Sequence, residues 1–512
     1  MHGQAFNRRQ FLAGTALAGV APSLTLSRGA ADVSGLRVGC TEADITPDIG
    51  MEQPGGYGKA FHKTLHDPCK VRAAVFENAG SRVALVSLDA LVVPRSVVLD
   101  ARREIRQRCG IPPEAVMIAA THSHSSGPTG MVQPGEYDHA DSFVRQLAYE
   151  KSSCADAGYL DRVRAQIVDV VSRAWQGRAP ARCSFGFGIE DKVAFNRRFR
   201  MKNGLTYTHP GKGNPDIVEA AGPVDPQVGV IGVWNEAGRL AGCVVNFACH
   251  GTTNPGGISA NWIYYLEQTI RGVFGADSVV LFLPGTCGDV TQVNNLSPYA
   301  EPQGEDWARF VGARVGAEAV KVLLSAVPGA DVPLSAESKV LRISRRKPSA
   351  ARLRRSLDVV RKSPEEAGQT EWTFAKEIVL LDALLKKAPE VDVETQAIQI
   401  GPVALPTSPA EYFCQFGLDL KKRGNFPLTF PVELANGFIG YVPTEEALGK
   451  RGGGYETRLT SYSNLVPPAG RQILEAGLEL MARMTPVTTP KPDSAPPFRA
   501  PWSYGDVPPE LD

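Results

Sequence analysis

Apolar and polar positions alternate along much of the chain in patterns that predict strands. Two pairs of apolar segments flank short turn-forming stretches, which is typical of β-hairpins. These pairs are residues 71–77 with 82–88, and residues 228–234 with 240–248. Shorter apolar runs predict buried strands. They occupy residues 115–120, 279–283, 340–344 and 396–404.

Other segments carry apolar residues at helical spacing. In residues 160–175 the side chains of Leu160, Val163, Ile167 and Val170 share one face, as in an amphipathic helix. Four further segments are expected to be helical: residues 96–108, 307–327, 410–421 and 470–484. Strands mixed with helices, including two hairpins, predict an α/β fold with a mixed β-sheet flanked by helices.

A charged segment, residues 349–388, predicts a pair of helices with a polar break near residues 363–368. We interpret it as a helical insertion in a catalytic domain that covers residues 36–485. Residues 486–512 carry eight prolines and are expected to form an extended tail.

The N-terminal residues resemble an export signal. Twin arginines, Arg8 and Arg9, precede a weakly apolar stretch over residues 12–26, and small residues follow at 29–31. This order is typical of a Tat signal peptide. We therefore expect residues 1–31 to be a signal peptide and the mature protein to be periplasmic or secreted.

Composition excludes several classes of protein. The 512 residues are 43% hydrophobic, which is enough for a large core, and the formal net charge is +1. The chain has no excess of basic residues of the kind that would indicate a nucleic-acid partner. No segment after the signal reaches the roughly 18 apolar residues of a transmembrane helix. The nine cysteines form no CxxC pair, so they are expected to be mainly core residues, with one disulfide left open.

Two of the eight histidines, His122 and His124, follow directly on the predicted strand at residues 115–120. In extended backbone, residues i and i+2 point the same way, so both imidazoles could face one site. One could bind a metal while the other transfers protons. An isolated HxH can also be a pair of surface or core histidines.

Three further strand patterns end in polar residues. Residues 244–249 lead into His250, and residues 281–284 lead into a Gly-rich turn that ends at Asp289. Arg197 and Arg198 lie near another strand end, where a permanently charged guanidinium suits a carbonyl or an oxyanion. The alternatives are a core histidine, a tight turn and a solvated basic patch.

Taken together and in order, the motifs resemble the catalytic domain of the neutral/alkaline, non-lysosomal ceramidases and their bacterial relatives. The ordered set is more specific than any single member. It comprises Ala43-Asp-Ile-Thr-Pro, Gly55-Gly-Tyr-Gly, His66-Asp-Pro, Val86-Ser-Leu-Asp-Ala, Thr121-His-Ser-His-Ser-Ser-Gly-Pro, Asn196-Arg197, Asn246-Phe-Ala-Cys-His-Gly, Gly285-Thr-Cys-Gly-Asp, Glu411, Gly440-Tyr-Val-Pro-Thr-Glu-Glu and Gly454-Tyr-Glu.

The resemblance implies a Zn²⁺ ion and a set of site residues. The implied metal ligands are His122, His250, Glu411 and Tyr441. Such a set holds zinc while it leaves room for water, whose pKa the metal lowers to about 7.

The resemblance also assigns residues to the chemical step. His124 would transfer protons, while Arg197 and Tyr455 would hold the scissile carbonyl and the oxyanion. The implied reaction is attack of zinc-activated water on an amide carbonyl.

Two departures bear on the substrate. Ceramidases carry a C-terminal β-sandwich domain, whereas the resemblance here ends soon after Tyr455, so we expect a bacterial relative that lacks this domain. Residues 253–265 also differ from the ceramidase pattern. The predicted function is a zinc amidohydrolase whose partner is a small-molecule N-acyl or lipid-like substrate.

Three other functions stay open from the sequence. The same metal site could serve an esterase or lactonase. The fold could belong to a non-catalytic secreted binding protein. A nucleophile enzyme has less support, because no GxSxG motif occurs and Cys287 is the single suggestive thiol.

Overall fold

The computed structural model describes residues 35–495 and 508–511, which belong to one compact unit. The predicted signal peptide, residues 1–31, lies outside the described residues, as does most of the second half of the predicted tail. Within the described part, no helix combines the length and apolarity that crossing a membrane requires.

An eight-stranded sheet forms the centre of this unit, and its strands run in the order β12-β11-β10-β5-β1-β2-β3-β4. Both predicted hairpins are confirmed, as β2–β3 and β10–β11. The pairs β3–β4 and β11–β12 are parallel and the others antiparallel, so the predicted mixed sheet is confirmed. The strands are β1 (Arg37–Asp44), β2 (Lys70–Asn78), β3 (Ser81–Leu88), β4 (Val116–Ala120), β5 (Ala179–Ile189), β10 (Gln227–Asn235), β11 (Leu240–Phe247) and β12 (Val279–Pro284).

The two ends of this sheet pack against each other. β12 contacts β2, β3 and β4, and the Ser87 hydroxyl donates a hydrogen bond of 2.6 Å to the Phe282 carbonyl. Leu281 and Leu283 share a buried cluster with Val86. Because the sheet folds over in this way, the ends of β4 and β11 meet although five strands separate them in the order. The loops after these strands pair at Ser123 and Gly251.

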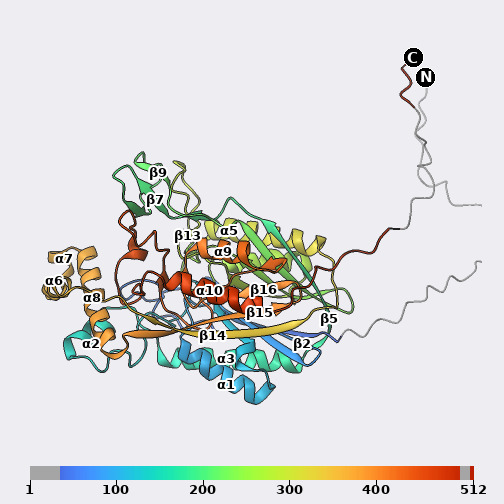
Figure 1. The fold of residues 1–512 in the computed structure, drawn as a ribbon, viewed down its shortest axis with the longest axis horizontal. Coiled ribbons are helices and arrows are strands. Elements are labelled where there is room, and N and C mark those ends of the chain that lie inside the picture. Colours follow the sequence, from blue (N-terminus) through green and yellow to red (C-terminus); the bar gives the residue numbers. More distant parts are fainter. Residues whose placement is uncertain (1–34, 496–507, 512) are drawn as a thin grey trace, which may run out of the picture. The chain divides into compact units, whose positions relative to one another are not determined.

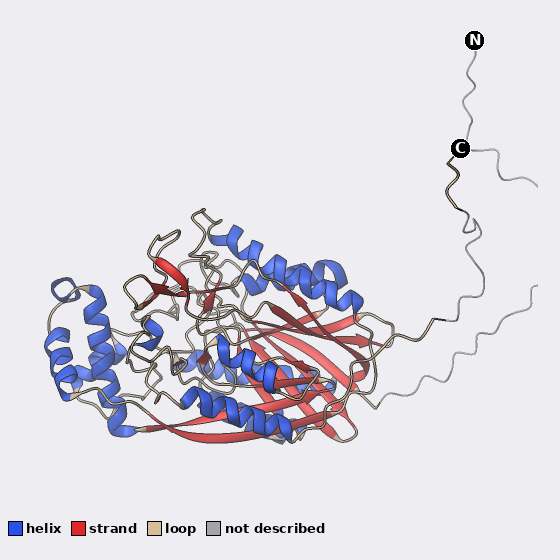
Figure 2. Cartoon of the chain, turned by 45° about the horizontal axis from the view of Figure 1, so that its top comes forward, coloured by secondary structure: helices blue, strands red, loops and turns tan. Residues whose placement is uncertain are grey.

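Helices cover the two halves of the sheet, and Figure 2 shows the strands enclosed between them. Helix α3 packs against β1–β3 with α1 beside it, α5 packs against β5 and β10, and α4 packs against α5 and β12. Three of the four were predicted. Helix α4 was missed, although Asn261 caps its N-terminus by accepting a hydrogen bond from the Trp262 backbone N–H. The bounds are α1 (Arg95–Cys109), α3 (Ala157–Gln176), α4 (Trp262–Phe274) and α5 (Gly304–Ser325).

Helices α4 and α5 approach closely at Gly312. A Cβ atom built on Gly312 would lie 2.1 Å from the Trp262 carbonyl oxygen and 2.8 Å from the Leu266 amide nitrogen. Both obstacles are backbone atoms, which cannot move aside as a side chain can. The first turn of α4 is also tied to the site described below, because the Trp262 indole donates to the His250 carbonyl at 2.8 Å.

We expect Gly312→Ala to lower the free energy of unfolding by about 1–3 kcal/mol, the usual cost of overpacking. The matched control is Gly272→Ala in α4, where an added Cβ meets nothing within 4 Å. That change should raise stability by about 0.4–1 kcal/mol, because it reduces the entropy of the unfolded chain. Urea unfolding of both variants measures the difference, and equal effects would contradict the close approach.

A second sheet of four strands contributes to the same large core as the first. The single strand predicted over residues 396–404 is wrong, because the chain turns at Gly401, whose φ of 58° is left-handed. The segment there consists of two antiparallel strands. The sheet contains β14 (Leu334–Ser344), β15 (Glu390–Ile400), β16 (Val403–Pro406) and β18 (Leu428–Thr429).

Three helices connect β14 to β15, in the segment expected to hold a helical pair. The predicted break at residues 363–368 contains a short helix that starts with a Ser363 capping box. This helical group lies beside α2, with which α8 shares an apolar cluster (Figure 1). The helices are α2 (Ser142–Tyr149), α6 (Ala350–Val360), α7 (Pro364–Ala367) and α8 (Gln369–Lys387).

Short strands and loops surround the edge where β4 and β11 end. The helix predicted from residue 410 begins only at Cys414, because residues 411–412 pair in parallel with residues 441–442. The remaining elements are β6 (Phe195–Asn196), β7 (Arg198–Met201), β8 (Thr206–Thr208), β9 (Ile217–Ala220), β13 (Val290–Thr291), β17 (Glu411–Tyr412), α9 (Cys414–Arg423), β19 (Tyr441–Val442), α10 (Ala469–Ala482) and the 3₁₀ turns Pro113–Ala115 and Tyr455–Thr457.

Candidate metal centre

His122 lies just after β4, with Thr121 between them, and is almost fully buried. Its φ of 65° is left-handed, so the extended backbone expected between His122 and His124 is wrong. The two imidazoles still meet: their Nε2 atoms lie 3.3 Å apart. The turn that begins at His122, rather than the alternation of a strand, brings them together.

Backbone carbonyls orient the two histidines that end strand segments. His122 Nδ1 donates to the Leu91 carbonyl at 2.9 Å, and His250 Nδ1 donates to the Val290 carbonyl at 3.1 Å. A carbonyl only accepts, so each Nδ1 carries the proton and each Nε2 presents a lone pair. This arrangement is typical of metal-binding histidines.

Glu411 lies between these two lone pairs. Its Oε2 atom is 3.3 Å from His122 Nε2 and 3.3 Å from His250 Nε2. Two ligands held about 2.0–2.1 Å from one tetrahedral zinc are separated by about 3.4 Å. His250 Nε2 and Glu411 Oε2 are buried and have no hydrogen-bond partner within the described part of the chain, and a shared metal ion would supply one. The residues present therefore fit a zinc ion.

Three of the four pKa shifts in the metal-free site favour this donor set. The fourth belongs to His122, where burial lowers the pKa but the adjacent Glu411 carboxylate outweighs burial and raises it. Burial together with Arg197 and His122 lowers the pKa of His250 to about 3. Burial, then the other two histidines, hold the pKa of His124 well below its usual value. Burial alone would raise the pKa of Glu411, but the adjacent His122 and His250 hold it well below the usual range. Neutral imidazoles and an ionised carboxylate are what zinc binds.

Tyr441 lies beside Glu411 on the neighbouring strand, β19. It is the direct register partner of Glu411 in the β17–β19 pair. Its hydroxyl lies 3.3 Å from the Tyr455 hydroxyl and accepts a hydrogen bond of 3.2 Å from Arg197. Burial, then Glu411, raises the pKa of Tyr441 well above its usual value, so without a metal this hydroxyl stays protonated.

Arg197 and Tyr455 face each other beside Tyr441. The Arg197 guanidinium lies 5.1 Å from the centre of the Tyr455 ring and is held by Glu456 Oε1 at 2.7 Å and the Gly288 carbonyl at 2.8 Å. Burial raises the pKa of Tyr455 to about 12, so both groups remain donors at neutral pH. The structure thus brings all seven predicted site residues together.

A second possible ligand set overlaps the predicted one. His122, His124 and His250 form a cluster in which the three ligand nitrogen atoms lie within 4.8 Å of one another. His124 is as close to His122 as Glu411 is. His124 is therefore placed either for proton transfer or for coordination, and the difference is measurable.

Two residues that the sequence offered as candidates for the chemistry, Cys287 and Asp289, have structural roles instead. The Cys287 thiol is buried and donates to Glu433 at 2.8 Å, and burial raises its pKa well above the usual value, which disfavours a thiolate nucleophile. Asp289 accepts hydrogen bonds from the Asn196 amide and the Cys414 backbone at 2.8 Å each. It holds together the segments that carry Arg197 and Glu411.

Sequence reasoning gave no role to two residues that support the site. Glu456 is fully buried and fixes Arg197, and its place beside a motif tyrosine was the only signal for it. Gly55 packs against His124, since an added Cβ would lie 2.3 Å from His124 Nδ1. The Gly-Gly-Tyr-Gly motif contributes only to the family resemblance in the sequence, although a glycine run often marks such a close approach.

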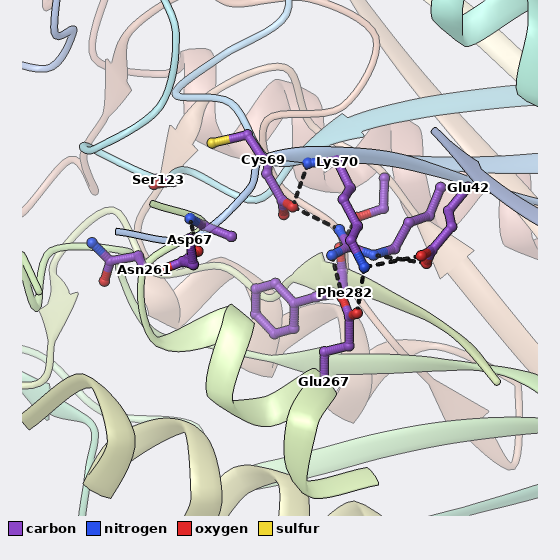
Figure 3. A network of polar contacts seen from close by, with 12 residues as sticks. Glu42, Asp67, Cys69, Lys70, Ser123, Asn261, Glu267 and Phe282 are labelled. Carbon is purple, nitrogen blue, oxygen red and sulfur yellow. Dashed lines mark hydrogen bonds and ion pairs between the residues drawn. The ribbon is translucent and has the colours of Figure 1, made fainter. Parts of the chain in front are cut away.

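A buried ion network lies below the loops that carry these residues. Arg72 pairs with Asp89 at 2.8 Å and also with Glu267, which is in turn paired with Lys70 at 2.7 Å (Figure 3). Burial opposes the charge of Glu267, but Arg72 and Lys70 lower its pKa to about 2. Asp89 follows the end of β3, which pairs with β4, so this network anchors the sheet edge from which His122 emerges.

Comparison with known proteins gives one curated relative and several solved structures. The relative is the neutral ceramidase of Pseudomonas aeruginosa, 28% identical over 308 residues, a match that covers 56% of this chain and 42% of that protein. The chain is a homologue of a neutral ceramidase. The resemblance inferred from the motifs is thereby confirmed, although the match spans less than half of the relative's length. No protein-family model matches the sequence.

The fold agrees with this relationship. A ceramidase complexed with C2 superposes with a TM-score of 0.62 at 20% identity, covering 89% of this chain and 77% of that one. The P. aeruginosa neutral ceramidase structure gives a TM-score of 0.61 at 20% identity, with 90% and 77% covered. The predicted α/β fold with a mixed sheet flanked by helices is therefore confirmed.

Proposed function

We propose that this chain is an exported, zinc-dependent amidohydrolase that cleaves the amide bond of an N-acyl substrate, ceramide-like or smaller. The observation that carries the proposal is the buried set of His122, His250 and Glu411, whose free donor atoms converge beside Arg197 and Tyr455. Homology to a neutral ceramidase supports a hydrolase of this class.

His122, His250 and Glu411 would hold the zinc ion, with Tyr441 as the fourth candidate ligand. When bound, zinc lowers the pKa of a coordinated water to about 7 and so supplies hydroxide near neutrality. Because the carbonyls of Leu91 and Val290 fix both imidazoles, the donor atoms are oriented before the metal arrives.

The other residues act on the substrate and its protons. His124 is neutral because burial and the adjacent histidines lower its pKa, so it can accept a proton from water and pass it to the leaving nitrogen. Arg197 and Tyr455 remain protonated and can donate hydrogen bonds to the carbonyl oxygen as it gains charge. Glu456 positions Arg197 for this contact.

Cleavage of a fluorescent short-acyl ceramide and of a short N-acyl amide by the zinc-loaded protein tests the proposal. We expect hydrolysis of at least one amide, its loss with a zinc chelator, and its return when zinc is added back. Hydrolysis of esters or lactones without any amide cleavage would contradict the amidase assignment.

We expect His124→Ala to retain one zinc per chain and to lose about 10²–10⁴ in kcat, the usual share of a general acid–base group. Zinc content by elemental analysis and kcat on the cleaved amide are measured together. The matched control is His139→Ala, because His139 contacts the Ala383 carbonyl in the helical insertion. Loss of zinc in His124→Ala would instead identify His124 as a ligand in the three-histidine set.

A further inference from the structure

A cavity of about 200 Å³ lies beside the candidate metal centre and has no part in the mechanism above. Its walls come from the helical insertion, the loops around residues 131–137 and 438–440, and the Gly-Gly-Tyr-Gly segment. The residues that matter for its chemistry are Tyr57, Glu136, Arg345, Glu377, Gly440 and Tyr462.

The cavity adjoins the site through two of its walls. Gly440 precedes Tyr441, whose backbone N–H donates to the Tyr462 carbonyl at 3.0 Å. The Tyr462 and Tyr57 rings lie 5.4 Å apart, and Gly55, two residues before Tyr57, packs against His124. A substrate that reaches the site between His124 and Tyr441 would therefore have this cavity next to its reacting bond.

Two arginines and two glutamates line the cavity: Arg95, Arg345, Glu136 and Glu377. Arg95 is paired with Glu394 at 2.8 Å. Glu136 accepts a hydrogen bond from the Gln133 backbone at 2.9 Å, and Arg345 donates to the Ala388 carbonyl and to Asn464. Neither side chain forms an ion pair with any residue in the described ranges. Glu377, in contrast, is paired with Lys376 at 3.2 Å and accepts from Ser461 at 2.6 Å.

The charged side chains that line the cavity determine which chemical groups can bind in it. An aliphatic chain would remove Glu136 and Arg345 from water without giving them partners, which is costly. A ligand with a large net charge would be repelled by one of the two. A group that carries several hydroxyls can donate to the carboxylate and accept from the guanidinium at the same time.

The volume sets the size of such a group. A cavity of about 150 Å³ holds one benzene molecule. The space here therefore suits one six-membered ring and is too small for a long sphingoid chain. Apolar side chains of Met131 and Phe438 complete the wall.

We propose that this cavity is a substrate subsite for a compact polyhydroxylated ring, such as the sugar ring of an N-acylated amino sugar. The inference rests on the proposed amidohydrolase function and adds the class of the amine portion. The hydroxyl groups bind between Glu136 and Arg345, and the acylated nitrogen points toward Tyr441 and His124.

Binding of glucosamine to the zinc-loaded full-length protein tests the subsite without any turnover. Calorimetric titration should give a Kd on the order of 1 mM, as expected of a small polar ligand. Glu136→Gln keeps the shape of the side chain and should weaken binding at least about tenfold, since a hydrogen bond to a charged group is stronger than one to a neutral group. Glu150→Gln, at the exposed C-cap of α2 outside the cavity, is the matched control.

A second variant distinguishes a blocked cavity from a protein that has lost its fold. Ser96 lines the cavity but is exposed in the first turn of α1, so Ser96→Trp should fold and block the entrance. Glucosamine binding that is absent in the wild type, or unchanged in both Glu136→Gln and Ser96→Trp, would overturn the subsite.

Hydrolysis of two amides with the same acyl group separates this proposal from the proposed function. The wild type should cleave N-hexanoyl glucosamine with a lower KM than N-hexanoyl octylamine, and Glu136→Gln should raise only the first KM. Glucosamine binding without cleavage of either amide would support the subsite and refute the amidase. Cleavage of both amides with equal KM would support the amidase and overturn the subsite.

Discussion

We expect His250→Ala to be purified without zinc and to be inactive. His250 supplies one of the two nitrogen atoms that converge on Glu411. Without it, the remaining ligands bind metal poorly. A metal supplies several kcal/mol of transition-state stabilisation, which corresponds to about 10³-fold or more in rate. Zinc per chain and amide hydrolysis should therefore fall together.

The control for this variant is His66→Ala. His66 is partly exposed and contacts the Tyr265 hydroxyl at 2.8 Å, so it should keep both zinc and rate. Circular dichroism should show that His250→Ala is folded, because the sheet that carries it does not depend on the imidazole. Full zinc occupancy with a normal rate in His250→Ala would exclude the proposed centre.

Sequence reasoning found the histidines because each ends an apolar strand. Residues 115–120 and 244–249 are continuous buried runs, and a polar residue at the end of such a run stands out. The hairpins were equally clear, since turn residues separate two apolar segments of matching length. Local pattern was sufficient for these features because the information lies within about ten residues.

The remaining geometry is non-local. No periodicity shows that β12 packs against β2–β4, yet this packing brings the ends of β4 and β11 together. The pairing of Glu411 with Tyr441 joins residues thirty positions apart, and local propensity instead favoured a helix over that segment. The resemblance assigned both residues without explaining how they meet.

The largest expected effect on stability comes from Arg72→Met. Arg72 is fully buried and pairs with both Asp89 and Glu267. Its removal takes away a positive charge that offsets these two buried carboxylates. Breaking such a pair typically costs about 3–5 kcal/mol. Urea unfolding measures the change. The matched control is Arg103→Met, whose exposed pair with Asp100 should contribute less than about 1 kcal/mol.

A double variant tests whether uncompensated charge is the cause. After Arg72→Met, Glu267 still has Lys70, whereas Asp89 has lost its only ion-pair partner among the described residues. Asparagine can still accept the hydrogen bond that the Lys70 backbone donates to Asp89. We therefore expect Arg72→Met/Asp89→Asn to recover about 1–3 kcal/mol relative to the single variant. If the double variant is no more stable, lost packing around the guanidinium, rather than the buried carboxylate, accounts for the destabilisation.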